Sequence, residues 1–148
     1  MLDQLLPRRI DTTYRGHKLA LWLFALLVLL KTGIGLGSIF NGHNAASSAD
    51  GIPLDTFPPA AAQTVVSLFA LLGLSHFMVC LLCILVLARY RALVPFLFGL
   101  LLLDHLSRKL ILYFLPIPRT GTPPGSIISL VLLGLMIAGL ALSLWKRE

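Results

Sequence analysis

Four polar residues stand in the middle of an otherwise apolar segment, residues 93–115: Asp104, His105, Arg108 and Lys109. Charge in the hydrocarbon of a bilayer is costly unless it is paired or serves a purpose. In a helix that turns about 100° per residue, all four share one arc of about 140°, and Asp104 can pair with Arg108. The opposite side is rich in leucine. The charged arc is therefore predicted to face other helices or headgroups.

Two further segments bring titratable groups to a similar depth. At a rise of about 1.5 Å per residue, Lys31, His76 and His105 come out about 18 Å from the cytoplasmic side, and Asp104 about 16 Å. Arg108 and Lys109 come out about 22 to 24 Å up. The sequence thus predicts a buried polar cluster, a candidate ligand or proton site, made of Lys31, His76, Asp104, His105, Arg108 and Lys109.

The polar cluster has two interpretations. In the structural one, Asp104 pairs with Lys31 or Arg108 to fix helix register, and Lys109 extends outward. In the functional one, a water-filled cavity open to the outside receives an anionic group on Arg108 and Lys109, and a histidine relays a proton. The ligand would be a small solute, a lipid or a quinone-like molecule.

A metal site is a weaker possibility in the second apolar run. His76, Cys80 and Cys83 fall within about 60° of one another on a helix, and such ligands suit Cu(I) or Zn. Free cysteine, however, commonly packs as a small apolar residue, and no second cysteine pair exists. A haem held between His76 and His105 is a further alternative. We leave the metal unknown and predict no cofactor.

Motifs of soluble enzymes are missing from the sequence. It contains no HExxH, no GxSxG and no phosphate loop. We therefore assign no catalytic residue, and the sequence favours a protein that is not an enzyme.

The composition defines the class of protein. Hydrophobic residues make up 57% of the 148 residues and the mean hydropathy is +0.91, above the range of soluble domains. Four runs reach about the 20 residues that a membrane crossing requires: 19–40, 61–88, 93–115 and 127–145. We predict an all-α integral membrane four-helix bundle, one domain over residues 1–148, with no soluble domain.

Basic residues indicate the orientation of the spans. Eight of them flank one side of the predicted membrane, whereas Arg119 alone lies on the other; the eight are Arg8, Arg9, Arg15, Lys18, Arg89, Arg91, Lys146 and Arg147. By the positive-inside rule both termini are cytoplasmic. This placement explains the net charge of +6 without nucleic acid. The predicted location is a cell membrane, the inner membrane of a bacterium, with an uncleaved first helix.

Small residues predict where helices pack. Gly33 and Gly37 in the first run, and Gly134 and Ala138 in the fourth, have the small-xxx-small spacing that allows close helix approach in lipid. We expect these faces to pack within the molecule; contact between copies of the chain is the alternative.

Three function classes remain open. We favour a small accessory or interaction protein of the bilayer, whose buried charges organise its own helices or those of a membrane-protein partner. The rival is a transporter or binding protein for a small anionic solute, lipid or quinone-like molecule. The third is a metal or haem redox protein that uses His76 and His105.

Overall fold

The computed structural model describes residue 14 and residues 16–145, and this part of the chain is all-helical, without strands. The four long helices are α2 (Lys18–Phe40), α4 (Pro59–Arg89), α5 (Val94–Phe114) and α6 (Pro124–Leu144). Their ends lie within three residues of the predicted apolar runs. The sequence therefore locates the helices well.

The helix starts follow local chemistry. The Nδ1 atom of His17 accepts a hydrogen bond from the backbone N–H of Leu19 at 3.1 Å and caps α2. Pro59 and Pro124 occupy the first positions of α4 and α6, where a missing N–H costs nothing and the fixed φ suits a helix.

Three helices of the described chain, α2, α4 and α6, are long and apolar enough to cross a membrane. Their most apolar windows are only 33%, 22% and 22% buried inside the molecule, so their remaining apolar surface needs a nonaqueous neighbour. The helix α5 has 21 residues but carries Asp104, Arg108 and Lys109, and it is not among the three. The described chain is thus all-helical, with three helices that are candidates for membrane spans.

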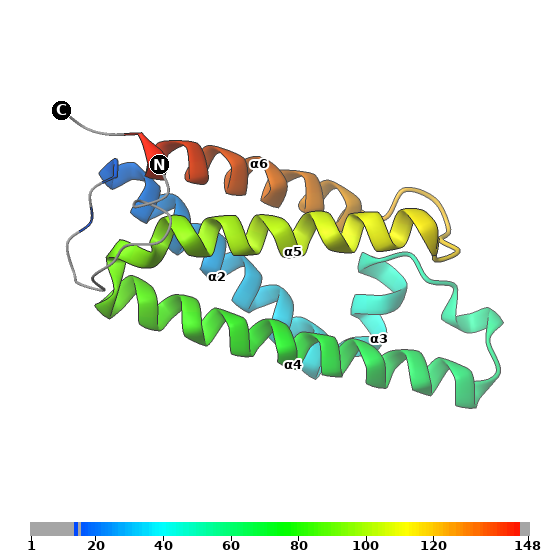
Figure 1. The fold of residues 1–148 in the computed structure, drawn as a ribbon. Helices are drawn as coiled ribbons and strands as arrows, with labels where there is room; N and C mark the ends of the chain where they lie inside the picture. Colours follow the sequence, from blue (N-terminus) through cyan, green and yellow to red (C-terminus); the bar gives the residue numbers. More distant parts are fainter. Residues whose placement is uncertain (1–13, 15, 146–148) are drawn as a thin grey trace.

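The long helices contact one another in the order α5, α6, α2, α4. Figure 1 shows α2 running obliquely behind the others, from α6 at one end to α4 at the other. The helices α4 and α5 meet through residues 90–93, which include the short η3 (Arg91–Leu93), and diverge from there. We call this end of the molecule the turn end, and the opposite end, with residues 41–58 and 115–123, the loop end.

Of the basic residues used to predict the topology, five lie outside the described residues: Arg8, Arg9, Arg15, Lys146 and Arg147. Lys18, Arg89 and Arg91 belong to elements at the turn end, and Arg119 to the loop end.

The hydrophobic core lies near the turn end. The rings of Phe24 and Phe98 meet edge to face, with centroids 5.0 Å apart at 72°. Gly139 of α6 lies against the Phe98 ring, where a side chain would collide. Cys80 and Cys83 of α4 are buried in the same core. Because the core fills the turn end, the polar residues further along the helices surround less tightly packed space.

Two glycines bring α2 and α4 into backbone contact. A Cβ atom built on Gly35 would lie 3.1 Å from the carbonyl oxygen of Gly73, and one built on Gly73 would lie 2.7 Å from the oxygen of Gly35. Such close approach is typical of helices associated in lipid. Sequence reasoning missed this pair because the two glycines stand on different helices and share no repeat.

The predicted packing residues lie elsewhere. A Cβ atom on Gly33, Gly37 or Gly134 would meet nothing within 4 Å, and Gly134 and Ala138 are exposed. Close packing of these residues against a neighbouring helix is not seen in the described chain, and their role in helix packing stays a prediction. The rotation of α2 that brings Gly35 onto α4 turns the predicted face away.

The loop between α2 and α4 is a folded element, which we call the lid (residues 41–58). It contains α3 (Gly42–Asn44), the π-helical η1 (Ala45–Ala49) and the 3₁₀-helical η2 (Leu54–Thr56). Its small core of Ala46, Ile52 and Leu54 packs on residues of α4.

One carbonyl oxygen of the lid accepts two hydrogen bonds from the loop between α5 and α6, residues 115–123, which we call the second loop. The backbone N–H and the hydroxyl of Thr120 both donate to the Gly51 oxygen, at 2.8 and 3.2 Å. Gly51 has φ of 72°, a left-handed conformation that favours glycine.

Candidate functional site

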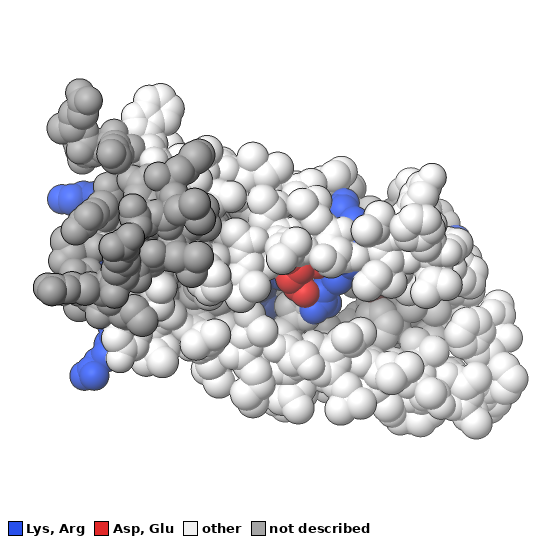
Figure 2. Space-filling model, in the orientation of Figure 1, with Lys and Arg blue, Asp and Glu red and all other residues white. Residues whose placement is uncertain are grey.

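A cavity of about 1270 Å³ occupies the space where α4 and α5 diverge. Residues of α2 and α6 also line it. Figure 2 shows a hollow on this face, in which acidic and basic side chains gather between α4 and α5. The lid contributes Asn44, Ala45 and Asp50 to the loop end of the lining, where the sequence predicts an outward mouth. Figure 2 shows an opening on the lateral face, between two helices.

The six residues of the predicted polar cluster all line this one cavity: Lys31, His76, Asp104, His105, Arg108 and Lys109. They come from α2, α4 and α5. Sequence reasoning did not select the other polar lining residues, which include Asn41, Asn44, Asp50, Arg119, Ser126 and Ser129. Most of these belong to the lid, the second loop or the first turns of α6, whose positions depend on how the loops fold.

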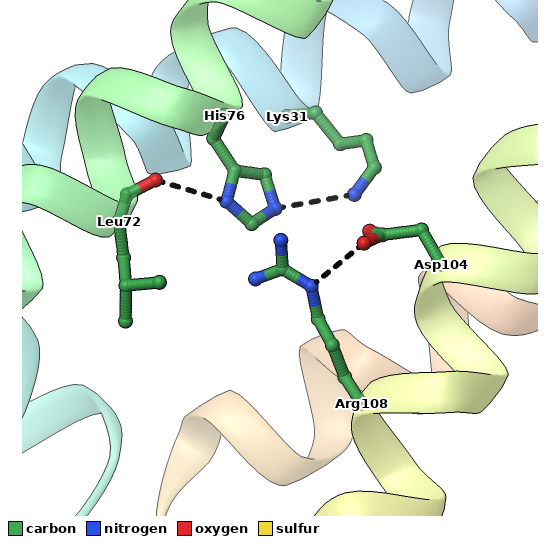
Figure 3. Close-up of polar contacts among 5 residues, drawn as sticks. All are labelled: Lys31, Leu72, His76, Asp104 and Arg108. Carbon is green, nitrogen blue, oxygen red and sulfur yellow. Dashed lines mark hydrogen bonds and ion pairs between the residues drawn. The ribbon is translucent and has the colours of Figure 1, made fainter.

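Asp104 and Arg108 form the expected ion pair along α5. The Nε atom of Arg108 donates to Oδ1 of Asp104 at 3.1 Å, and the two side chains are 42% and 43% exposed. The two terminal nitrogens of the guanidinium point away from the carboxylate, and one of them points toward His76 (Figure 3). Asp104 thus orients Arg108 and leaves the terminal N–H groups of the guanidinium facing the cavity.

Lys31 is the most buried charge of the cluster, at 5% exposed. Its Nζ atom lies 3.4 Å from Nε2 of His76, and in the described part of the chain it forms no ion pair with Asp104. Of the two partners predicted for Asp104, the structure pairs it with Arg108 and not with Lys31, although the amine lies between the imidazole and the carboxylate in Figure 3. The direct partner of Lys31 is thus the neutral imidazole of His76 and not the carboxylate of Asp104.

The partners of His76 define its tautomer. Its Nδ1 atom lies 3.3 Å from the carbonyl oxygen of Leu72, which can only accept. Nδ1 therefore carries the proton and donates, and Nε2 is the acceptor for the Lys31 amine. His76 is neutral in this arrangement, and its unprotonated nitrogen faces the cavity.

The second histidine has a separate partner. Nε2 of His105 lies 3.2 Å from the Ser129 hydroxyl, which joins α5 to α6. With the Nε2 atoms of His76 and His105 engaged by Lys31 and Ser129, the geometry gives no support to a haem held between them. The described residues contain no group of three or more His, Cys, Asp or Glu side chains placed to hold a metal ion. Cys80 and Cys83, which the sequence offers with His76 as metal ligands, are both buried in the core.

The cavity combines uneven charge with apolar walls. Four cationic side chains, Lys31, Arg108, Lys109 and Arg119, face two carboxylates, Asp50 and Asp104. Burial raises the pKa of Asp50 above its ordinary 3.8, and Arg119 partly opposes that rise. The remaining wall is largely hydrophobic and includes Ile34, Phe69, Leu72, Ile111 and Ile128. The site therefore suits a molecule with one anionic group and an apolar body.

Comparison of the chain with protein-family models, with curated proteins and with solved structures found no match.

Proposed function

We propose that this membrane protein binds an anionic amphiphile in the cavity between α4 and α5, as a binding or transport protein and not as an enzyme. The observation that carries the proposal is the pairing pattern of two cations. Among the described residues, buried Lys31 has a neutral imidazole as its one hydrogen-bond partner, and Arg108 directs its terminal nitrogens into the same space. An anion placed there would supply acceptors that the protein does not provide.

The lateral opening and the apolar walls favour an amphiphile over a small hydrophilic solute. A cavity of about 1270 Å³ exceeds the roughly 300–1000 Å³ of ordinary small-molecule pockets, so it has room for a chain as well as a headgroup. A hollow that faces lipid admits molecules from the bilayer. The ligand class is therefore an anionic oxygen group, carboxylate or phosphate, at the end of an apolar chain.

The binding proposal includes a topology. We propose that α5 is a fourth membrane span in a four-helix bundle, with both termini in the cytoplasm and the lid outside, in a bacterial inner membrane. The placement of Lys18, Arg89 and Arg91 at the turn end supports this orientation. The polar side of α5 faces the cavity, where its charged groups can be paired or hydrated.

Cysteine labelling in intact cells tests the topology. The native thiols are first removed as Cys80→Ala and Cys83→Ala, and exposed Ser48 in the lid or exposed Arg91 at the turn end is then replaced by cysteine. A membrane-impermeant maleimide should label the Ser48→Cys protein only. Labelling of Arg91→Cys alone would reverse the orientation, and labelling of both would refute the four-span topology.

A thermal-shift series tests binding. The protein in mild detergent is heated with palmitate, hexadecyl phosphate or hexadecanol, which share a chain length and differ in the headgroup. We expect one or both anions to raise the unfolding midpoint and the alcohol to leave it unchanged. Preference between carboxylate and phosphate identifies the headgroup. Equal effects of all three compounds would refute recognition of charge.

A role as an interaction protein is the second candidate, and the exposed small residues favour it. Gly33, Gly134 and Ala138 present smooth helix surfaces that nothing in the described chain covers. This function predicts that another membrane protein co-purifies in fixed stoichiometry and is lost on Gly33→Leu. Unchanged co-purification in that variant would remove Gly33 from the interface.

A further inference from the structure

We propose that the binding of the anion is coupled to the uptake of one proton by His76. This inference rests on the proposed anion site and specifies how that site changes when it is filled. The relevant observation is the hydrogen-bond polarity of the Lys31–His76 pair, which joins α2 to α4 beside the Arg108 guanidinium.

While Lys31 is an ammonium, which can only donate, His76 in the empty site cannot carry a second proton and keep both partners. Nδ1–H donates to the Leu72 carbonyl, so Nε2 must be unprotonated to accept from Lys31. The pair therefore holds at most one positive charge.

An anion between Lys31 and Arg108 changes these requirements. The Lys31 ammonium, at 3.4 Å a long partner for His76, gains a charged acceptor and turns toward it. Nε2 of His76 then loses its donor and presents a lone pair to the anion. Two acceptors in contact repel each other, whereas a protonated Nε2 donates a third hydrogen bond to the anion. Binding thus favours a proton on Nε2.

The charged groups around the His76 imidazole are consistent with the binding of an anion together with a proton. The helix α2 contributes Lys31, and α5 contributes Asp104, His105, Arg108 and Lys109 to the shared cavity. On its own helix the titratable neighbour one turn away is Cys80, and α6 contributes the uncharged Ser129. Asp50 and Arg119 complete the set at the loop end. Adding one anion and one proton leaves the total charge of this set unchanged, so the cavity keeps its cationic character.

Proton uptake distinguishes His76 from the other histidine of the cavity. His105 is bonded to Ser129 through its Nε2 atom, on the α6 side of the cavity. It does not share the Lys31 partner and needs no change of hydrogen bonding when that amine moves. His105→Gln is therefore the matched control for His76→Gln. In the latter variant the amide oxygen can still accept from Lys31 but cannot take up a proton.

The test is calorimetric titration of the purified protein with hexadecanesulfonate, which stays ionised at all pH values used. The titration is repeated at one pH in buffers of different ionisation enthalpy, and the slope gives the protons bound per ligand. Between about pH 6 and 8 we expect uptake approaching one proton, with affinity rising by up to about tenfold for each unit of acidification. His76→Gln should bind without uptake, whereas His105→Gln should still take up a proton for each ligand that it binds, whatever its affinity.

The possible results separate the two proposals. Binding without proton uptake by the native protein would overturn the coupling and leave the anion site intact. Uptake that persists in His76→Gln, or vanishes in His105→Gln, would also overturn the assignment to His76. If hexadecanesulfonate, palmitate and hexadecyl phosphate all fail to bind to the native protein, the proposed function itself is wrong.

Discussion

The Lys31–His76 contact lies one helical turn from the place where Gly35 and Gly73 bring the backbones of α2 and α4 into contact. Lys31 precedes Gly35 by four residues, and His76 follows Gly73 by three, so the glycine crossing and the polar contact share one interface. Contact between the two backbones brings the amine and the imidazole within 3.4 Å. The position of the polar site therefore depends on two residues that carry no functional group.

This relationship predicts a sharp contrast between two glycine substitutions. Gly73→Ala places a methyl group 2.7 Å from the Gly35 carbonyl and should cost about 1–3 kcal/mol of stability through overpacking. Gly33→Ala meets nothing within 4 Å and should be neutral or stabilising by up to about 1 kcal/mol, because alanine favours helix. Thermal unfolding in detergent measures both. Equal midpoints would contradict the assigned interface.

Arg108 should dominate the affinity for an anion. Arg108→Ala removes the charge and the terminal N–H groups and should weaken palmitate or hexadecyl phosphate binding by about tenfold to a hundredfold. Arg108→Lys keeps the charge but lacks the planar guanidinium, so its affinity should lie between those of the native protein and Arg108→Ala. Asp104→Asn tests orientation of the guanidinium and should lower affinity less than Arg108→Ala. Native affinity in Arg108→Ala, with normal membrane insertion, would exclude this residue as the anion contact.

Docking of the lid should depend on Gly51. Gly51 and Gly121 both have positive φ, 72° and 68°, so alanine strains the backbone at either position. Only at Gly51 does an added Cβ also press on neighbours, Pro123 Cβ at 3.1 Å and the Thr120 oxygen at 3.2 Å. Gly51→Ala should therefore accelerate proteolytic cleavage of the lid more than Gly121→Ala does. The reverse order would refute the docking contact.

Asp50 should make stability depend on pH. Its pKa is raised by burial, so the folded protein favours the neutral carboxyl. The contribution of this group to stability is fully present below pH 3.8, the ordinary pKa that it has in the unfolded chain. It is lost as the pH rises through the raised pKa of the folded protein. Asp50→Asn should therefore unfold at a higher temperature than the native protein at neutral pH, and the difference should shrink on acidification. Asp55→Asn, at an exposed lid position, is the control for loss of charge.

An Asp50→Asn midpoint that is below the native value at neutral pH would show that the carboxylate stabilises the lid. In that case the interaction with Arg119 would outweigh the cost of burial.

The sequence predicted the helices and the membership of the polar cluster because both follow from one-dimensional patterns. Apolar length located α2, α4, α5 and α6, and helical spacing paired Asp104 with Arg108. Depth counting brought Lys31 and His76 to the level of that pair, and they line the same cavity.

Relationships between helices were beyond the sequence patterns. The spacing of Gly33 and Gly37 identifies a smooth face but not the rotation of α2, which depends on the Gly35–Gly73 crossing. The same rotation decides that Lys31 meets His76 and not Asp104. The fold of the lid could not be predicted either, because its course depends on tertiary contacts such as the hydrogen bond from Thr120 to Gly51.

The most direct test of the anion site is native mass spectrometry of the protein released from detergent after incubation with hexadecyl phosphate, palmitate or hexadecanol. We predict one retained anionic amphiphile for each native chain, no retained hexadecanol, and loss of the bound anion in the folded Lys31→Met, Arg108→Ala double variant. Retention of the anion by that variant at the native level, or retention of hexadecanol as strongly as of the anions, would contradict the proposed site.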